Sequence, residues 1–109
     1  MILSVFERLL LRNVVPQIQG WNYAHMKEAR ELTEGLFTEQ EEIDLAFTQD
    51  GQKVHWRLAK EDGTPIPQDK DIPISDGLKA KLAKYLTQLD KQEKLGLEHM
   101  SLYEKFVLK

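Results

Sequence analysis

Apolar residues recur at helical spacing near both ends of the chain, and they alternate with polar residues only in its middle. Over residues 2–13, spacings of three and four place six apolar side chains on one broad helical face. These are Ile2, Leu3, Val5, Phe6, Leu9 and Leu10. Pro16 and Gly20 end the pattern. We therefore predict a first helix over residues 2–13 that buries this face.

A second helix is predicted over residues 23–34. Asn22 stands at the N-cap position, where a side-chain oxygen can accept a hydrogen bond from a free backbone N–H. Gly35 follows at a place where a left-handed residue often ends a helix. The apolar side of this helix continues to Leu36.

A short third helix is predicted to begin after Thr38 and to end by about Leu45. The sequence TEQE at residues 38–41 matches a capping box, in which Thr38 caps the helix and Glu41 reaches back to the Thr38 N–H. Three acidic residues lie near the positive end of the helix dipole: Glu39, Glu41 and Glu42. We interpret them first as helix stabilisers.

Residues 43–58, IDLAFTQDGQKVHWRL, are typical of a β-hairpin hinged on Asp50 and Gly51. Helix and strand are competing predictions over residues 43–46. A two-residue Asp-Gly loop favours a type I′ turn, in which both central residues have positive φ. Such a turn pairs Gln49 with Gln52, Phe47 with Val54 and Leu45 with Trp56 on one face. It pairs Thr48 with Lys53, Ala46 with His55 and Asp44 with Arg57 on the other. The first face is apolar and is expected to pack on the helices.

The second half of the chain predicts a polar loop, an edge strand and two helices. The loop covers residues 60–71, and the strand covers residues 71–75, where Pro73 restricts it to a sheet edge. A long helix is expected from residue 75 or 76 to about 94, with an apolar stripe and lysines facing away from it. The last helix is expected over residues 98–107.

These elements predict one α+β domain over residues 1–109, with four or five helices packed on a two- or three-stranded antiparallel hairpin sheet. The expected core is Phe6, Leu9, Leu10, Leu32, Leu36, Leu45, Phe47, Val54, Trp56, Leu82, Leu86, Leu89, Leu102 and Phe106. A winged-helix-like fold is the alternative, because three helices precede the hairpin. Its recognition helix would be the acidic sequence EQEEID, which would repel the phosphates of nucleic acid.

Charge and composition narrow the classes of function. The 109 residues carry a net charge of −3 and no cysteine, which suits a reducing cytoplasm. Residues 1–50 hold four basic and nine acidic side chains, whereas residues 51–109 hold eleven basic and nine acidic ones. The basic excess is small, so nucleic acid is not the expected partner. The first apolar run is interrupted by Glu7 and Arg8, so neither a signal peptide nor a membrane span is expected.

The sequence holds no pattern typical of catalysis. His25, His55 and His99 lie on different elements without a metal-binding spacing. The serines are Ser4, Ser75 and Ser101, and none lies in GxSxG. We therefore expect no metal, nucleotide or other cofactor and no enzyme activity. A small hydrolase is retained as an alternative, and it would need a cleft in which a histidine meets a carboxylate.

Two stretches carry a resemblance to a known group of proteins. FTEQEEIDLAFTQDGQKVHW and LDKQEKLGLEHMSLYEKF resemble short proteins of uncharacterised function from phages and bacterial genomes. The resemblance covers most of the chain. It implies a phage or prophage setting, and it transfers no site residues.

The remaining features favour protein–protein contact as the basis of function. Leu11, Val14, Val15 and Ile18 lie beyond the predicted apolar stripe and exceed what one small core face needs. Aromatic residues with a polar group, such as Trp21 and Tyr23, are common at interfaces. The candidate partner-binding residues are Val14, Val15, Trp21, Tyr23, Glu39, Glu41 and Glu42. A homodimer through the first helix and residues 14–23 is the specific hypothesis, and the alternative is that these apolar residues complete the core.

Overall fold

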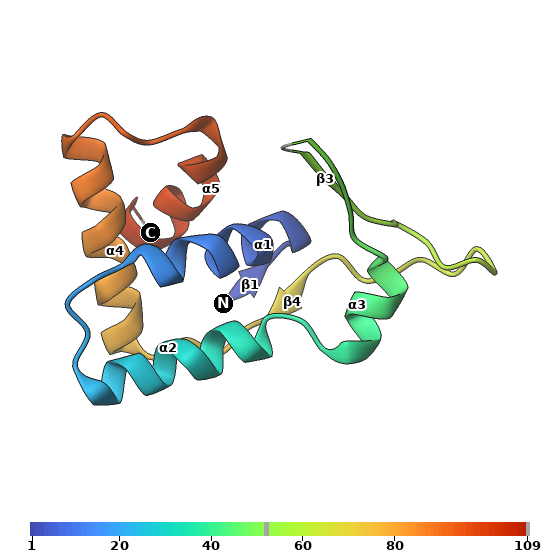
Figure 1. The fold of residues 1–109 in the computed structure, drawn as a ribbon, viewed down its shortest axis with the longest axis horizontal. Helices are drawn as coiled ribbons and strands as arrows, with labels where there is room; N and C mark the ends of the chain where they lie inside the picture. The colour runs from blue at the N-terminus through green and yellow to red at the C-terminus, as the bar shows by residue number, and fades with distance from the viewer. Residues whose placement is uncertain (52, 109) are drawn as a thin grey trace.

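Five α-helices and two separate two-stranded antiparallel sheets form the α+β fold of residues 1–51 and 53–108, the part of the chain that the computed structural model describes. The helices are α1 (Val5–Val14), α2 (Tyr23–Gly35), α3 (Glu39–Leu45), α4 (Asp76–Lys91) and α5 (Met100–Tyr103). Shorter helical turns are η1 (Val15–Gln17), η2 (Leu97–His99) and the π-helical η3 (Glu104–Leu108). The strands are β1 (Ile2–Leu3), β2 (Thr48–Asp50), β3 (Lys53–His55) and β4 (Lys70–Asp71). Figure 1 shows α1 at the centre, with α4 at one end of the molecule and α3 and the hairpin at the other.

The predicted capping residues begin the second and third helices. The Asn22 side chain accepts a hydrogen bond from the His25 N–H at 2.8 Å, and α2 begins at Tyr23 as expected. Thr38 and Glu41 form the predicted capping box of α3, which ends at Leu45. Gly35 is not the left-handed residue predicted after α2, because it is the last residue of that helix and Leu36 after it is right-handed, with φ of −63°. A left-handed residue, Ala46 with φ of 48°, follows α3 instead.

The start of the chain differs from the prediction, because Ile2–Leu3 is a strand and not the first turn of a helix. Ser4 and Glu7 form a second capping box, which fixes the start of α1 at Val5. Strand β1 pairs with β4 in an antiparallel register, Ile2 opposite Asp71. Strand β4 covers Lys70–Asp71, so the predicted edge strand over residues 71–75 is wrong beyond Asp71, and β4 pairs with the N-terminus and not with the hairpin.

The buried face of α1 matches only part of the predicted one, because Leu3 and Val5 are buried as expected and the other predicted residues are not. Arg8 and Leu11 point into the protein, whereas Phe6 is 45% exposed and Leu9 and Leu10 are only partly buried. The apolar side chains that the sequence left in surplus complete the core instead, and these are Leu11, Val14, Val15 and Ile18. The part of the expected core face that carries Phe6, Leu9 and Leu10 is therefore only partly covered.

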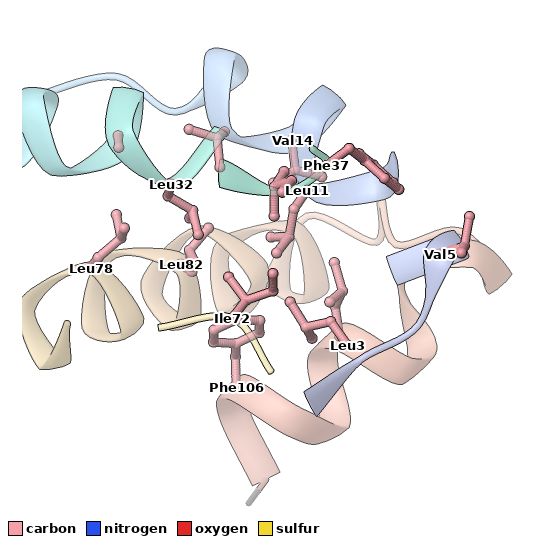
Figure 2. Close-up of a cluster of buried hydrophobic side chains, with 14 of the residues drawn as sticks. Leu3, Val5, Leu11, Val14, Leu32, Phe37, Ile72, Leu78, Leu82 and Phe106 are labelled. Atoms are coloured by element: carbon pink, nitrogen blue, oxygen red, sulfur yellow. The ribbon is translucent and has the colours of Figure 1, made fainter. Parts of the chain in front are cut away.

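The core lies between α1, α2, α4 and the C-terminal turns, with side chains converging from all of them (Figure 2). Seven predicted core residues are buried: Leu32, Leu36, Leu45, Leu82, Leu86, Leu102 and Phe106. Five are partly buried against this core: Leu9, Leu10, Phe47, Trp56 and Leu89. Phe6 and Val54 were wrongly placed in the core, because both are exposed.

The hairpin forms with a register different from the predicted one. Asp50 pairs with Lys53, and Thr48 pairs with His55 instead of Lys53. Only Gly51 of the Asp-Gly pair has positive φ, so Asp50 stays in the strand and the turn begins one residue later. The predicted Gln49–Gln52 pair falls on a residue outside the described ones, and Gln49 faces Val54.

The apolar face of the hairpin is nevertheless the predicted one. A shift of two positions along β3 leaves each side chain on its original face, because side chains alternate with a period of two. The rings of Phe47 and Trp56 are in edge contact, with centroids 6.5 Å apart.

The C-terminal elements are shorter than predicted. Helix α4 ends at Lys91, because the chain turns at Glu93, whose φ is 55°. The predicted last helix over residues 98–107 is divided into η2, α5 and η3.

Replacing Leu11 by alanine should lower the free energy of unfolding by about 2–5 kcal/mol, since it removes a fully buried side chain. Replacing Phe6 by alanine should lower it by less than about 1 kcal/mol, because that ring is largely exposed. Urea unfolding followed by circular dichroism measures both changes. Equal losses for the two variants would contradict the orientation of α1.

Candidate functional site

A groove of about 830 Å³ lies on the uncovered face of α1. Phe6, Leu9 and Leu10 line its apolar floor. One wall is formed by β3 and Trp56, and the other by Glu98 and His99 of η2. Figure 1 shows the hairpin and the η2–α5 stretch rising beyond α1 from two different parts of the fold. We call this hollow the α1 groove.

The floor follows the helical repeat of α1. Phe6, Leu9 and Leu10 are continued by Asn13 and Gln17, at spacings of three and four that share one face. From Phe6 to Gln17 the floor extends about 16 Å, at about 1.5 Å per residue. The α1 groove is therefore about three helical turns long.

Arg8 fixes which face of α1 points outward. Its side chain is 0% exposed, and its Nη1 donates to the Leu36 carbonyl at 3.0 Å and to the Glu41 carboxylate at 2.7 Å. Its Nη2 donates to the Gln68 carbonyl at 2.9 Å. The guanidinium also lies 4.5 Å from the centre of the Phe37 ring. Arg8 is thus held by three separate segments, and its role is structural.

Glu41 lies at the centre of this polar cluster. Lys70 donates to its second carboxylate oxygen at 2.8 Å, which joins β4 to α3. Burial alone would raise the pKa of Glu41, but hydrogen bonds from Lys70, Arg8 and the Thr38 N–H outweigh it and lower the pKa to about 2. Glu41 is consequently a structural anion and not a free surface charge.

Glu7 joins α1 to the C-terminal turns. Its carboxylate accepts hydrogen bonds from Ser101 and Lys105, the latter at 2.7 Å. Burial raises the pKa of Glu7, but these two partners and the Ser4 N–H lower it further than burial raises it. The η2–α5 wall of the α1 groove is therefore anchored to the helix that forms the floor.

Three aromatic rings in successive contact attach the hairpin wall to the rest of the fold. Phe37 and Phe47 meet edge to face with centroids 5.3 Å apart, and Phe47 meets Trp56 in turn. Trp56 also donates its Nε1–H to the Gln68 side chain at 2.9 Å. Beyond this anchor the strand residues are exposed, including Val54 at 39%.

The predicted partner-binding residues do not form one surface. Val14 and Val15 are buried in the core, which corrects their assignment to an interface. Trp21 is partly buried and donates its Nε1–H to the Ile18 carbonyl at 2.8 Å. Tyr23 is 77% exposed on α2.

The three acidic residues predicted to bind a partner differ in their exposure and in their ion pairs. Glu39 is exposed, Glu41 is held by Arg8 and Lys70, and Glu42 pairs with Arg12 at 3.1 Å. With Val14 and Val15 buried, the segment expected to form a homodimer presents little apolar surface.

Two histidines line the α1 groove. His99 accepts a hydrogen bond at Nδ1 from the Gly96 N–H at 2.9 Å, and Nδ1 lies 3.9 Å from Glu98 Oε1. His99 and Glu98 thus lie side by side in a cleft, but Nδ1 is occupied as an acceptor and forms no hydrogen bond with the carboxylate at 3.9 Å, so they are not the paired groups that the hydrolase alternative requires. Among the described residues that line the groove, there is also no serine, threonine or tyrosine to act as nucleophile.

The described residues contain neither a candidate metal site nor a candidate membrane-spanning helix. Across residues 1–51 and 53–108, no three histidine or carboxylate side chains are grouped so that they could hold a metal ion. None of the helices in this part of the chain combines the length and apolar character needed to cross a membrane.

Comparison with family models, with curated proteins and with solved structures finds no match to this chain. The resemblance to short phage and bacterial proteins and the winged-helix alternative therefore stay predictions.

Helical periodicity misassigned Phe6, Leu9 and Leu10 because it counted Arg8 as a surface residue. Two local features of the sequence indicate the observed orientation of α1. Ser4 and Glu7 form the capping box that starts α1 at Val5. Leu11 and Val14 continue the face that carries Arg8, at spacings of three.

The ionised form of Glu41 should stabilise the fold, because its folded-state pKa of about 2 lies below the ordinary value of 4.5. Its contribution is fully present above about pH 4.5 and disappears as the pH falls toward 2. After allowance for solvent screening, we expect Glu41→Gln to remove about 1–2 kcal/mol at pH 7 and to flatten the acid limb of stability against pH. Urea unfolding at several pH values measures this. The matched control is Glu39→Gln on the same helix turn, and an equally large loss there would contradict the assignment.

Proposed function

We propose that this protein is a non-enzymatic protein-interaction module whose α1 groove binds an amphipathic helix of a partner protein. The observation that carries the proposal is the uncovered apolar face of α1 between two walls. The resemblance to short phage and bacterial proteins and the cysteine-free composition support a phage-encoded assembly or regulatory role in the cytoplasm.

The groove and its rim supply continuous apolar surface. Val54 and Trp56 add to the floor from the hairpin side. On the opposite rim, Leu97 is 86% exposed and Met100 is exposed beside the lining residues Glu98 and His99. Apolar side chains gathered in a concave site with a few polar groups are typical of a binding site.

The shape of the groove favours a helix as the occupant. A floor about 16 Å long accommodates about three helical turns laid along α1. A second copy of this chain is a poorer fit. Its own α1 lies at the bottom of an identical groove, so the walls of the two copies would meet before the floors.

The charges on the two walls indicate which charges the partner helix carries on each side. Lys53 and His55 line the hairpin wall, and Glu98 lines the opposite wall. A complementary helix carries carboxylates toward Lys53 and a basic residue toward Glu98. Such pairs set orientation more than they raise affinity.

The hairpin also gives a reason for partner binding. An isolated two-stranded hairpin is marginally stable in water. Strands β2 and β3 pair only with each other within the described residues, and every residue assigned to them is exposed. A helix seated in the α1 groove would cover Val54 and stabilise this wall.

A synthetic helical peptide of about 12 residues tests the proposal, with leucines on one face, glutamates on one flank and lysines on the other. Trp21→Phe leaves Trp56 as the only tryptophan, so its fluorescence reports on the groove. We expect a saturable blue shift of the emission as the peptide covers Trp56. Leu9→Asp and Val54→Asp should each weaken binding at least about tenfold, because a carboxylate then faces the leucines.

The matched control is Met26→Asp, which places the same charge on an exposed apolar residue of α2. Affinity should not change in this variant, and circular dichroism should show that all variants remain folded. Equal weakening by Met26→Asp, or no fluorescence change with the peptide, would refute the proposal. A concentration-dependent dimer in light scattering that Leu9→Asp abolishes would instead assign the groove to a second copy.

A further inference from the structure

A second groove, of about 770 Å³, lies between α4 and residues 17–19. Its lining is mostly polar. It consists of Lys81, Lys84 and Lys94, four glutamines, the ring of Tyr85, and the apolar side chains of Ile18 and Leu89. No carboxylate occurs among its described lining residues, in a chain whose net charge is −3. We call it the lysine groove.

Local geometry brings the cations together. Lys81, Lys84, Gln88 and Gln92 follow one another at spacings of three and four, which aligns them on one side of α4 and its C-cap. The chain then reverses at Glu93, and the Lys94 N–H donates to the Leu89 carbonyl at 2.8 Å. Lys94 is thereby returned beside the last turns of the helix.

The charges in the groove are not neutralised by neighbours. Lys84 and Lys94 are exposed, and no ion pair is formed by either within residues 1–51 and 53–108. Lys81 is directed to the Gly20 carbonyl and lies 5.2 Å from the centre of the Trp21 ring. The nearby Asp90 accepts a hydrogen bond from Tyr103 and is not in the lining.

We infer that the lysine groove binds the phosphodiester backbone of single-stranded nucleic acid. Three ammonium groups suit a row of phosphates, and the amides of Gln88 and Gln92 can donate to phosphates or bases. The concave shape favours a single strand, because proteins that bind single strands hold the backbone in a positively charged groove. The inference is independent of the α1 groove and rests on different residues.

Fluorescence anisotropy of a labelled oligothymidine of about ten nucleotides, with the intact chain, tests it. Three lysine–phosphate contacts predict a slope of about −2 for log affinity against log salt concentration, or about 16-fold weaker binding between about 50 and about 200 mM salt. Lys84→Gln and Lys94→Gln should each reduce the slope by about 0.7. Lys53→Gln removes the same charge from the other groove and should leave the slope unchanged.

Four outcomes would overturn the inference. One is the absence of binding at about 50 mM salt, where such contacts are strong. A second is an equal reduction of the salt slope in Lys53→Gln, which would show general electrostatic attraction and not binding in the lysine groove. The third and fourth are binding of polyglutamate, or of anionic phospholipid vesicles, with the same dependence on Lys84 and at least the affinity of the oligonucleotide. These would assign the groove to an acidic peptide or to a lipid surface.

Discussion

The buried guanidinium of Arg8 is the interaction on which the arrangement of the other elements depends. It joins α1 to the Leu36 carbonyl, to Glu41 of α3 and to the Gln68 carbonyl ahead of β4. A buried charge is tolerated only when it is paired and its donors are satisfied. Because Arg8 must point inward, the apolar face on the other side of α1 must point outward. The α1 groove is thus a consequence of burying this charge.

Helical periodicity could predict that a helix follows the N-terminus, but it could not predict the rotation of that helix. The pattern weighs apolar against charged residues, and it therefore placed Arg8 at the surface and Phe6 in the core. The groups that satisfy Arg8 lie 28 to 60 residues away along the chain, and only the folded protein brings them together. The apolar residues expected in surplus complete the core, as the alternative hypothesis predicted. Val14 and Val15 fill the core, and the surplus is Phe6, Leu9 and Leu10.

Features controlled by local chemistry were predicted well. Asn22 and Thr38 accept hydrogen bonds from backbone groups three residues away, so their caps depend on no distant contact. The hairpin shows an intermediate case. Its apolar face follows from the alternation of side chains, but its register depends on which residue of Asp50-Gly51 leaves the strand. Turn preference favoured Asp50 as the first residue of the turn. In the structure Asp50 instead pairs with Lys53 in the strand, and Phe47 packs on Phe37.

The two grooves are neighbours and share structural elements. Gln17, at the end of η1, lines both of them. The stretch from Gln92 to His99 borders the lysine groove at one end and the α1 groove at the other. It contains the left-handed Glu93, and its far end is anchored through Ser101 to Glu7. A ligand in either groove therefore contacts the stretch that also borders the other. Lys53 and Lys84 each line only one groove, so substitutions there separate the two proposed binding functions.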